Sequence, residues 1–114
     1  MLSKKYRLLE GTRLNESITT PFFVIKTAKN EKAYSRFGFT VSKKIDKRAV
    51  VRNRIKRQVR SCVEQNLEKI KPGRDILFII KKGAVGKETG TLCQTVLKEF
   101  EKNKFLNNAL KKET

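Results

Sequence analysis

Histidine is absent from the 114 residues of the chain, and acidic residues are scarce, with 11 Asp and Glu in total. Without an imidazole, a serine or cysteine nucleophile lacks its usual base and a metal ion lacks a common ligand. A nuclease could instead hold metal ions with clustered carboxylates. Here the only aspartates are Asp46 and Asp75, and most glutamates lie beside lysines. We therefore expect no catalytic residues and no metal ion held by the protein.

Long apolar runs are also missing. The longest extends from Ile76 to Ile80, which is far too short to cross a bilayer. Residues 1–13 have a basic start but lack the apolar segment that follows it in a secretory signal. We therefore expect no membrane partner.

Cysteine occurs only twice, as Cys62 and Cys93, and this spacing matches no metal-binding or redox motif. Each cysteine lies on the apolar side of a predicted helix, so we expect two buried, reduced thiols. Reduced thiols favour a cytoplasmic location.

Positive charge is what the chain has in excess. It contains 28 Lys and Arg, for a net charge of +17 and a pI near 10.3. With 38% hydrophobic residues the chain can still build a modest core, so we expect one domain over residues 1–114. A charge of this size predicts a polyanionic partner, and nucleic acid is the first candidate.

Three segments have the composition of β-strands. Residues 22–28 are apolar and β-branched, and residues 36–42 alternate, with one face directed to a core and one face left accessible. Residues 75–82 begin as a continuous apolar run, which predicts a central strand covered on both faces. Residues 1–21 are rich in turn formers, and only "YRLLEG" there is suited to a helical turn.

Two segments have helical periodicity. Over residues 49–67, Val51, Ile55 and Val59 form an apolar stripe, and the opposite side is cationic. A second helix is expected from Thr91, its predicted cap, through Phe100, followed by a short fraying helix over residues 104–114. The predicted fold is α+β, a two-layer α-β sandwich with a small mixed sheet of about four strands.

The most basic segment covers residues 43–60, with nine Lys and Arg against Asp46. Charged helix faces are often only solvated surface, but such a density of like charge costs stability unless a polyanion offsets it. A strand, not a short helix, precedes the basic helix, which argues against a helix-turn-helix. We therefore expect RNA, bound through phosphates and ribose hydroxyls.

Residues 39–60, "FTVSKKIDKRAVVRNRIKRQVR", closely resemble the signature of the bacterial ribonuclease P protein subunit. The similarity centres on the Arg52-Asn53-Arg54 core, followed by basic residues up to Arg60, and it extends from about Pro21 to Phe100. It implies a non-catalytic subunit that helps a ribozyme remove the 5′ leader of precursor tRNA. It also implies that Mg²⁺ is held mainly by the RNA, and that the strand-helix-strand crossover is left-handed, against the usual rule.

The implied partners are the catalytic RNA and precursor tRNA, with no small-molecule substrate. The residues that match the family's RNA-binding surface are Lys43, Lys44, Lys47, Arg48, Arg52, Asn53, Arg54, Lys56, Arg57 and Arg60. The candidates for a cleft that binds the single-stranded leader are Phe22, Val24, Lys26, Thr40, Ser42, Lys81 and Lys82. For Phe22, plain core packing is the alternative to base stacking.

The N-terminal segment, residues 1–21, departs from the family pattern. The family's first helix carries a pair of phenylalanines that line the leader cleft, whereas the apolar side chains here are Tyr6, Leu8 and Leu9. We expect a shortened segment and a reduced cleft wall. If leader binding shows that the cleft is intact, we expect a residue of 1–21, first of all Tyr6, to replace the missing wall. Two other functions stay open: a ribosome-associated or general structured-RNA-binding protein, and a catalytic nuclease.

Overall fold

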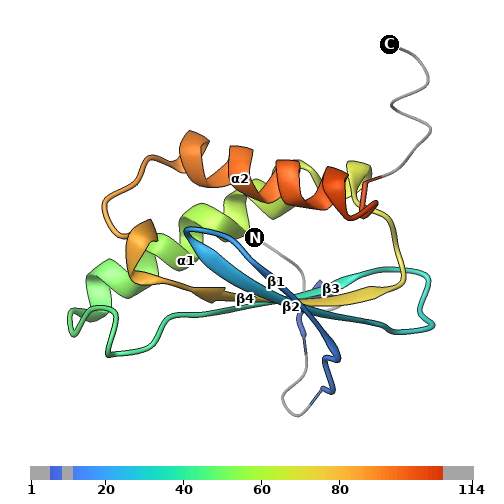
Figure 1. Ribbon diagram of the computed structural model, residues 1–114, viewed down its shortest axis with the longest axis horizontal. Helices are drawn as coiled ribbons and strands as arrows, with labels where there is room; N and C mark the ends of the chain where they lie inside the picture. The colour runs from blue at the N-terminus through green and yellow to red at the C-terminus, as the bar shows by residue number, and fades with distance from the viewer. Residues whose placement is uncertain (1–5, 9–11, 107–114) are drawn as a thin grey trace.

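The computed structural model describes residues 6–8 and 12–106 (Figure 1). Its strands are β1 (Glu16–Thr19), β2 (Phe23–Lys29), β3 (Arg36–Thr40) and β4 (Arg74–Ile80). Its helices are α1 (Ala49–Gln65) and α2 (Thr89–Lys102), with short 3₁₀ turns at Leu67–Lys69 and Lys82–Ala84. The predicted α+β fold is confirmed.

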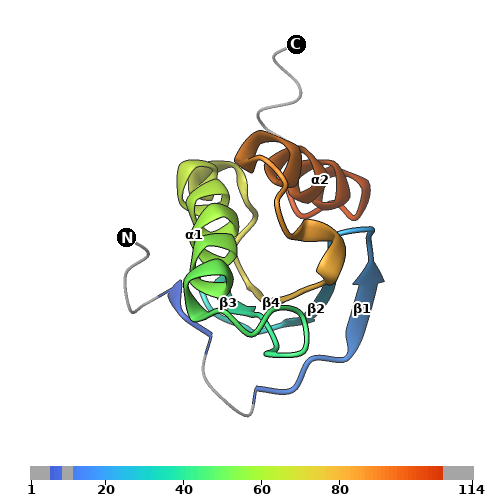
Figure 2. The ribbon, with the colours of Figure 1, turned by 90° about the vertical axis from the view of Figure 1, so that its left-hand side faces the viewer.

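The four strands form one mixed sheet in the order β1-β2-β4-β3. Strands β1 and β2, and likewise β2 and β4, are antiparallel, whereas β3 and β4 are parallel and are joined through α1. Both helices lie on the same face of the sheet (Figure 2). The left hand of the β3-α1-β4 crossover stays a prediction from the family resemblance.

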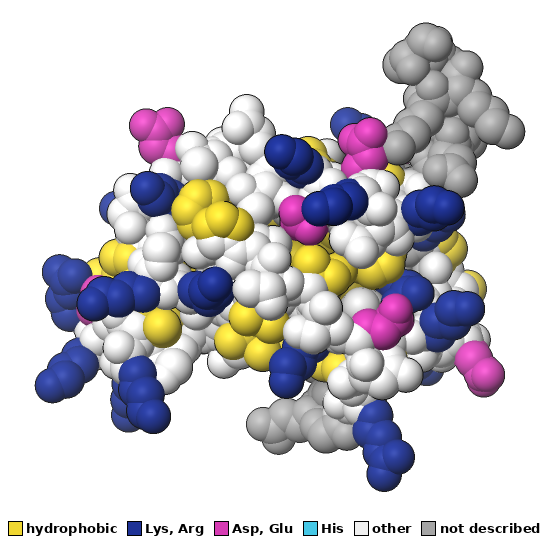
Figure 3. Space-filling view, in the orientation of Figure 1, with side chains coloured by type: hydrophobic (Ala, Val, Ile, Leu, Met, Phe, Trp, Pro, Cys, Tyr) yellow, Lys and Arg dark blue, Asp and Glu magenta, His cyan; other side chains and the backbone are white. Residues whose placement is uncertain are grey.

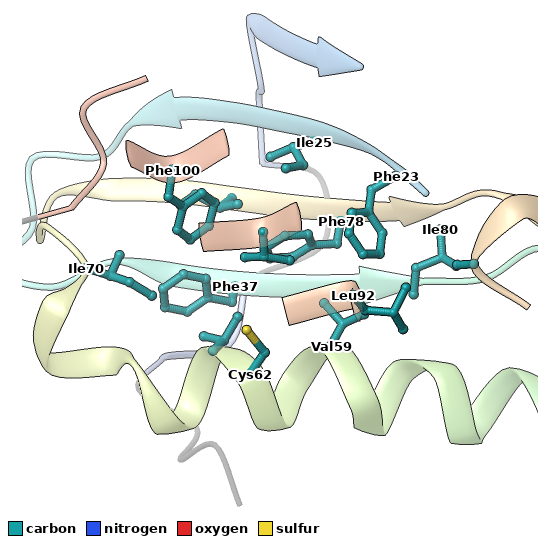
Figure 4. Packing of buried hydrophobic residues seen from close by; sticks show 14 of the residues in the cluster. Phe23, Ile25, Phe37, Val59, Cys62, Ile70, Phe78, Ile80, Leu92 and Phe100 are labelled. Atoms are coloured by element: carbon teal, nitrogen blue, oxygen red, sulfur yellow. The ribbon is translucent and has the colours of Figure 1, made fainter. Parts of the chain in front are cut away.

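The core lies between this sheet and the two helices. Strand alternation directs Phe23 and Phe78 toward the helices, where both are fully buried with Phe100 of α2 (Figure 4). The Phe78 ring lies 5.9 Å from each of these two rings. Burying one such side chain contributes roughly 1.5–3 kcal/mol. On α1 the predicted apolar stripe is buried at Ile55 and Val59.

Strand β4 is central, as predicted, but it is not covered on both faces. Leu77 and Ile79 are only half-buried, because both helices pack on the side of Ile76, Phe78 and Ile80. Two helices of this size cover one face of a four-stranded sheet. The opposite face, called here the open face, is therefore apolar at its centre and accessible.

Helix α2 begins at Thr89, two residues before the predicted start. Its first backbone hydrogen bonds include Leu92 N–H donating to the Glu88 carbonyl at 3.1 Å, so Glu88 is the N-cap residue. Thr91 is not a cap: its carbonyl accepts a hydrogen bond from the Thr95 hydroxyl inside the helix. The prediction was wrong because apolar periodicity marks the packed part of a helix, and the first turn of α2 is exposed.

Cys62 and Cys93 form a disulfide, with their Cα atoms 5.5 Å apart. The prediction of two reduced thiols was therefore wrong. Each cysteine lies on the apolar side of its helix, as expected, and α1 packs against α2, which brings the two sulfurs together. The argument for a cytoplasmic location from reduced thiols no longer holds, and that location stays a prediction.

Strand β1 was not predicted, because residues 1–21 are rich in turn formers, which indicate loops. It pairs with β2 as a hairpin. Thr20 closes the turn into β2: its hydroxyl oxygen accepts hydrogen bonds from the N–H groups of Phe22 and Phe23, at 3.2 and 2.9 Å. Further upstream, the chain runs beside β3, where Leu8 N–H donates to the Phe37 carbonyl at 2.9 Å. The helical turn expected around residues 6–11 falls partly outside the described residues.

After α2 the chain leaves the helical path. Lys104 has a φ of +63°, and Phe105 N–H donates to the Phe100 carbonyl at 2.7 Å, which ends the helix. Leu106 then forms a β-bridge with Ile70. The predicted helix over 104–114 is thus absent from residues 104–106, since Phe105 turns back to cover Phe100. Residues 107–114 lie outside the described range.

Candidate nucleic-acid interface

The cationic side of α1 forms a shallow hollow of about 350 Å³. It is lined by Asn53, Lys56, Arg57 and Arg60, which share one helix face because they are spaced by three and four residues. Sequence periodicity had placed these four residues together opposite the apolar stripe. In Figure 3, Lys and Arg side chains gather at the left end of the molecule, where Figure 1 shows the start of α1.

The position of Arg60 is set by the core. Its guanidinium carbon lies 5.6 Å from the centroid of the Phe39 ring, and this ring stacks on buried Phe78 at 5.4 Å. Guanidinium groups are held over aromatic faces by their attraction to the ring quadrupole. Arg60 therefore presents its charge from a fixed place at the junction between α1 and the sheet.

Arg52 and Arg48 shape the loop before α1. Arg52 donates to the backbone carbonyls of Asp46 and Lys47, at 2.9 and 2.8 Å. The Asp46 carboxylate accepts hydrogen bonds from the backbone and guanidinium of Arg48, and these bonds lower the pKa of Asp46 to about 2. Asp46, the only acidic residue of the basic segment 43–60, thus stabilises the loop before α1. The side chains left exposed nearby are Lys43, Lys44, Lys47 and Arg54.

The first turn of α1 adds to this positive potential. It contains no acidic residue, and its N-cap, Arg48, makes no side-chain capping bond. A helix N-terminus carries a partial positive charge and unpaired N–H groups. Within the described part of the chain, no ion pair involves the cations of residues 53–60. This end of the molecule is therefore suited to a polyanion.

Val50 lies among these cations and was not singled out in the sequence. It is 70% exposed, the only large apolar side chain of the described residues that is so open. A helical wheel alone could have found it, since Val50 lies outside the buried stripe. It adds an exposed apolar side chain to the first turn of this basic helix.

The leader-cleft candidates divide into two groups, and three of them share the open face. Val24 and Thr40 pair with Ile79 on either side of β4, and Lys26 pairs with Leu77. Because paired residues point to the same side of a sheet, these five side chains form one surface. Leu77 and Ile79 were not predicted to belong to this surface. Their exposure could have been expected, because two helices are too few to cover both faces of the sheet.

Ser42, Phe22, Lys81 and Lys82 lie near the end of the sheet. The Ser42 hydroxyl accepts a hydrogen bond from Lys44 N–H at 3.1 Å. Phe22 packs edge-on against Phe23, with the Lys87 ammonium 5.9 Å from its ring.

The two lysines at the end of β4 differ in their availability. The Lys81 ammonium donates to the Thr20 carbonyl at 2.9 Å and is half-buried. Lys82 opens the following 3₁₀ turn and is exposed. Of the two, Lys82 is the one that presents a free charge to solvent.

The N-terminal segment contributes to the open face through Leu8. A methyl group on Gly38 would come within 3.2 Å of Leu8 and 3.0 Å of Leu77, so glycine at this position lets Leu8 lie against the sheet. Tyr6 instead packs edge-on against Tyr34, with ring centroids 5.8 Å apart. Leu8, not Tyr6, is thus the described N-terminal residue that adjoins this face.

Two features are absent from the described residues, a metal-binding cluster and a helix that could span a membrane. They contain no group of three or more His, Cys, Asp or Glu that could hold a metal ion. Within the same ranges, no helix has the length and apolarity needed to cross a membrane.

The family model described as Ribonuclease P matches residues 2–104. The chain belongs to the ribonuclease P protein family. The resemblance seen in residues 39–60 is therefore confirmed, and the sandwich fold agrees with it.

Relatives and solved structures support this assignment. The ribonuclease P protein component of Mycoplasma capricolum subsp. capricolum is 31% identical over 99 residues, which cover 86% of this chain and 90% of the relative. That of Geobacillus kaustophilus is 41% identical over 88 residues, covering 71% and 72%. The RNase P proteins of Staphylococcus aureus and Thermotoga maritima superpose with a TM-score of 0.71 and 30% identity. These alignments cover 81% and 76% of this chain, and 84% and 82% of the respective structures.

Proposed function

We propose that this chain is the non-catalytic protein subunit of ribonuclease P. It binds the catalytic RNA and the 5′ leader of precursor tRNA, and it promotes removal of the leader to give mature tRNA 5′ ends. The observation that carries the proposal is the hollow formed by Asn53, Lys56, Arg57 and Arg60 on α1 of a ribonuclease P family fold.

The α1 face binds the catalytic RNA. Its cations extend from the loop before the helix to Arg60, and Asp46 is engaged by Arg48 within that loop. Phosphate groups would offset the repulsion among these cations, and each phosphate contact would release a counterion. Asn53, exposed beside Arg57, adds a neutral donor and acceptor for a ribose or base edge.

The open face binds the leader. Val24, Leu77 and Ile79 provide a flat apolar strip, and Lys26 provides a cation beside it. The strip is aliphatic, so base stacking contributes less than on aromatic platforms, where it is worth about 1–3 kcal/mol per base. Leader binding is therefore governed by charge and shape more than by leader sequence.

The chemistry belongs to the RNA and to the Mg²⁺ ions that it mainly holds. The chain has no histidine, and its described residues offer no clustered carboxylates for a metal ion. The protein's part is to position the RNA strands, and its contribution is largest when Mg²⁺ is scarce.

The test is cleavage of precursor tRNA at low Mg²⁺ by the catalytic RNA alone, the protein alone and both together. We expect no cleavage by the protein alone and faster cleavage by the complex. Magnesium-dependent cleavage by the protein alone, lost on mutation of one carboxylate, would show a nuclease instead. Equal affinity for unrelated structured RNAs would show a general RNA-binding protein.

Variants of the α1 face locate the binding surface. Arg57→Ala and Arg60→Ala should each weaken binding to the catalytic RNA and lower the slope of log affinity against log salt by roughly one. Lys98→Ala, which removes an exposed cation from α2, is the matched control. Unchanged salt slopes for both arginine variants would contradict the assignment of this face.

A further inference from the structure

A second cationic hollow, of about 330 Å³, lies at the opposite end of the sheet from the start of α1. The end of β2, the turn that leads into β4 and the turn after α2 build it together. Its charged lining consists of Lys29, Lys71, Arg74 and Lys104 against Glu31. These cations come from three separate segments, so their convergence is a product of the fold.

Arg74 is the fixed part of this hollow. Its guanidinium carbon lies 4.7 Å from the centroid of the buried Phe105 ring, and it donates to the carboxylate of Glu16 at 2.8 Å. Glu16 therefore balances much of the Arg74 charge. Across the described ranges, no ion pair involves Lys29, Lys71 or Lys104, and these three ammonium groups remain available to an anion.

The backbone of the hollow is unusual. Glu31, Gly73 and Lys104 have φ values of +59°, +90° and +63°, and they are three of the four described residues with positive φ. For a side chain other than glycine this conformation is strained. Such strain is retained where the rest of the structure imposes it, often at binding sites.

Lys104 occupies a position where glycine is preferred. The N–H groups of Lys104 and Phe105 donate to the carbonyls of Glu101 and Phe100, and the rings of Phe100 and Phe105 pack at 5.6 Å. This is the Schellman arrangement, in which the left-handed residue is usually glycine. A lysine there also benefits from the negative end of the helix dipole. The dipole does not explain why Lys29 and Lys71 converge on the same hollow from other segments.

We propose that this hollow binds a phosphate of an RNA strand, as a second phosphate site separate from the α1 face. The ligand class rests on the RNA binding proposed above. Strand β4 runs from Arg74 toward the start of α1 (Figure 1), and its seven residues span on the order of 20 Å. One phosphate cannot serve both sites, so the hollow contacts a different part of the RNA.

The experiment is an NMR titration of the ¹⁵N-labelled full chain with a mixed-sequence single-stranded RNA oligonucleotide. A parallel titration uses inorganic phosphate. We expect the amide signals of Gly73 and Phe105 to shift with the RNA, in addition to those of α1. Shifts in α1 alone would overturn the second site and leave the proposed function standing. The absence of shifts in both places would overturn both. Shifts of the hollow with inorganic phosphate but not with RNA would overturn RNA as the ligand.

Two substitutions separate binding from folding because they relieve the same backbone strain. Lys104→Gly should weaken RNA binding at the hollow several-fold while Tm stays the same or rises. Glu31→Gly should strengthen binding, because it removes the carboxylate that faces the same ligand, again without loss of Tm. Opposite effects on affinity are expected from these two changes. Equal affinities for the wild type and both variants would overturn the proposal.

Discussion

The α1 face and the open face, two of the candidate RNA surfaces of this protein, are built in different ways. One helix and the loop before it supply the α1 face, whose cations lie within one stretch of chain from Lys43 to Arg60. Three strands supply the open face, where Val24, Thr40 and Ile79 come from distant parts of the sequence. The first surface depends on local helical geometry, and the second depends on strand register. Changes to the shared core should therefore affect both, and changes to the sheet should affect only one.

Ile55→Asp should have the largest effect, because it removes the common support of both surfaces. Ile55 is 2% exposed on the apolar stripe of α1, and an unpaired carboxylate there has no compensating partner. We expect a loss of more than about 4 kcal/mol of unfolding free energy, measured by urea denaturation. The exposed neighbouring change Arg54→Ala should leave stability nearly unchanged and reduce RNA affinity. A stable Ile55→Asp variant would contradict the burial of this face.

Reduction of the disulfide should have the next largest effect on stability. Cys62 and Cys93 are 31 residues apart, and closing a loop of this length stabilises the fold by about 3–4 kcal/mol in the chain-entropy model. Thermal melts with and without a thiol reductant provide the measurement, and the double variant Cys62→Ala/Cys93→Ala is the control that no longer responds. RNA affinity of the folded, reduced protein should stay near that of the oxidised form, since Arg60 is placed by Phe39. A large loss of affinity would show that the disulfide also orients α1.

Asp75→Asn tests the sheet that carries the open face, because Asp75 lies on β4. Asp75 accepts hydrogen bonds from the Arg36 guanidinium, at 2.8 and 2.6 Å, and from the Asn30 amide at 2.9 Å. Burial alone would raise the pKa of Asp75, but these bonds outweigh it and hold the pKa below its usual value. Loss of the carboxylate leaves Arg36 nearly buried without its partner, at a cost of about 3 kcal/mol in urea denaturation at neutral pH.

The same pair predicts the direction of the pH dependence. Because the folded-state pKa of Asp75 is lowered, its contribution to stability is fully present above the unfolded value of about 3.9 and is lost as the pH falls through the folded pKa. The Asp75→Asn variant should therefore lose less stability than the wild type below about pH 4. Glu68→Gln, which removes an exposed carboxylate outside the core, is the matched control. Parallel acid curves for wild type and Asp75→Asn would contradict the role of this pair.

A change in the length of the 5′ leader should have the smallest effect. It tests the open face without changing the α1 face. With Leu8 and an aliphatic strip in place of aromatic platforms, a leader of several nucleotides should improve protein-dependent affinity less than a hundredfold over a leader of one nucleotide. That limit corresponds to about 2.7 kcal/mol. Lys26→Ala should remove part of the improvement, and Lys98→Ala should not. An improvement well above a hundredfold would show a complete cleft, with residues 1–21 supplying more than Leu8.

Several elements could be predicted because their signals are local. The amphipathic pattern predicted a helix over residues 49–67, and α1 spans Ala49–Gln65 with Ile55 and Val59 buried as expected. The alternation in and after β3 directed Phe37, Phe39 and Val41 toward the core, where Phe37 is buried and the other two are half-buried. The start of α2, the hairpin around Thr20 and the disulfide were not predicted. The disulfide joins cysteines 31 residues apart, which meet only after the chain folds. The exposed first turn of α2 and the turn formers around Thr20 carry no apolar periodicity that would mark them.

The amino-acid sequence by itself predicted a polyanionic partner and the cationic side of α1. A net charge of +17 selects a polyanion whatever the fold, and helical periodicity alone gathers Asn53, Lys56 and Arg57 on one side. Only the tertiary structure decided that Leu77 and Ile79 lie uncovered on the open face, that Cys62 meets Cys93, and that Lys29, Lys71 and Lys104 share a hollow. The physical reason is distance along the chain. Helix geometry relates residues three or four apart, whereas strand register and helix packing join residues tens of positions apart, which no local pattern encodes.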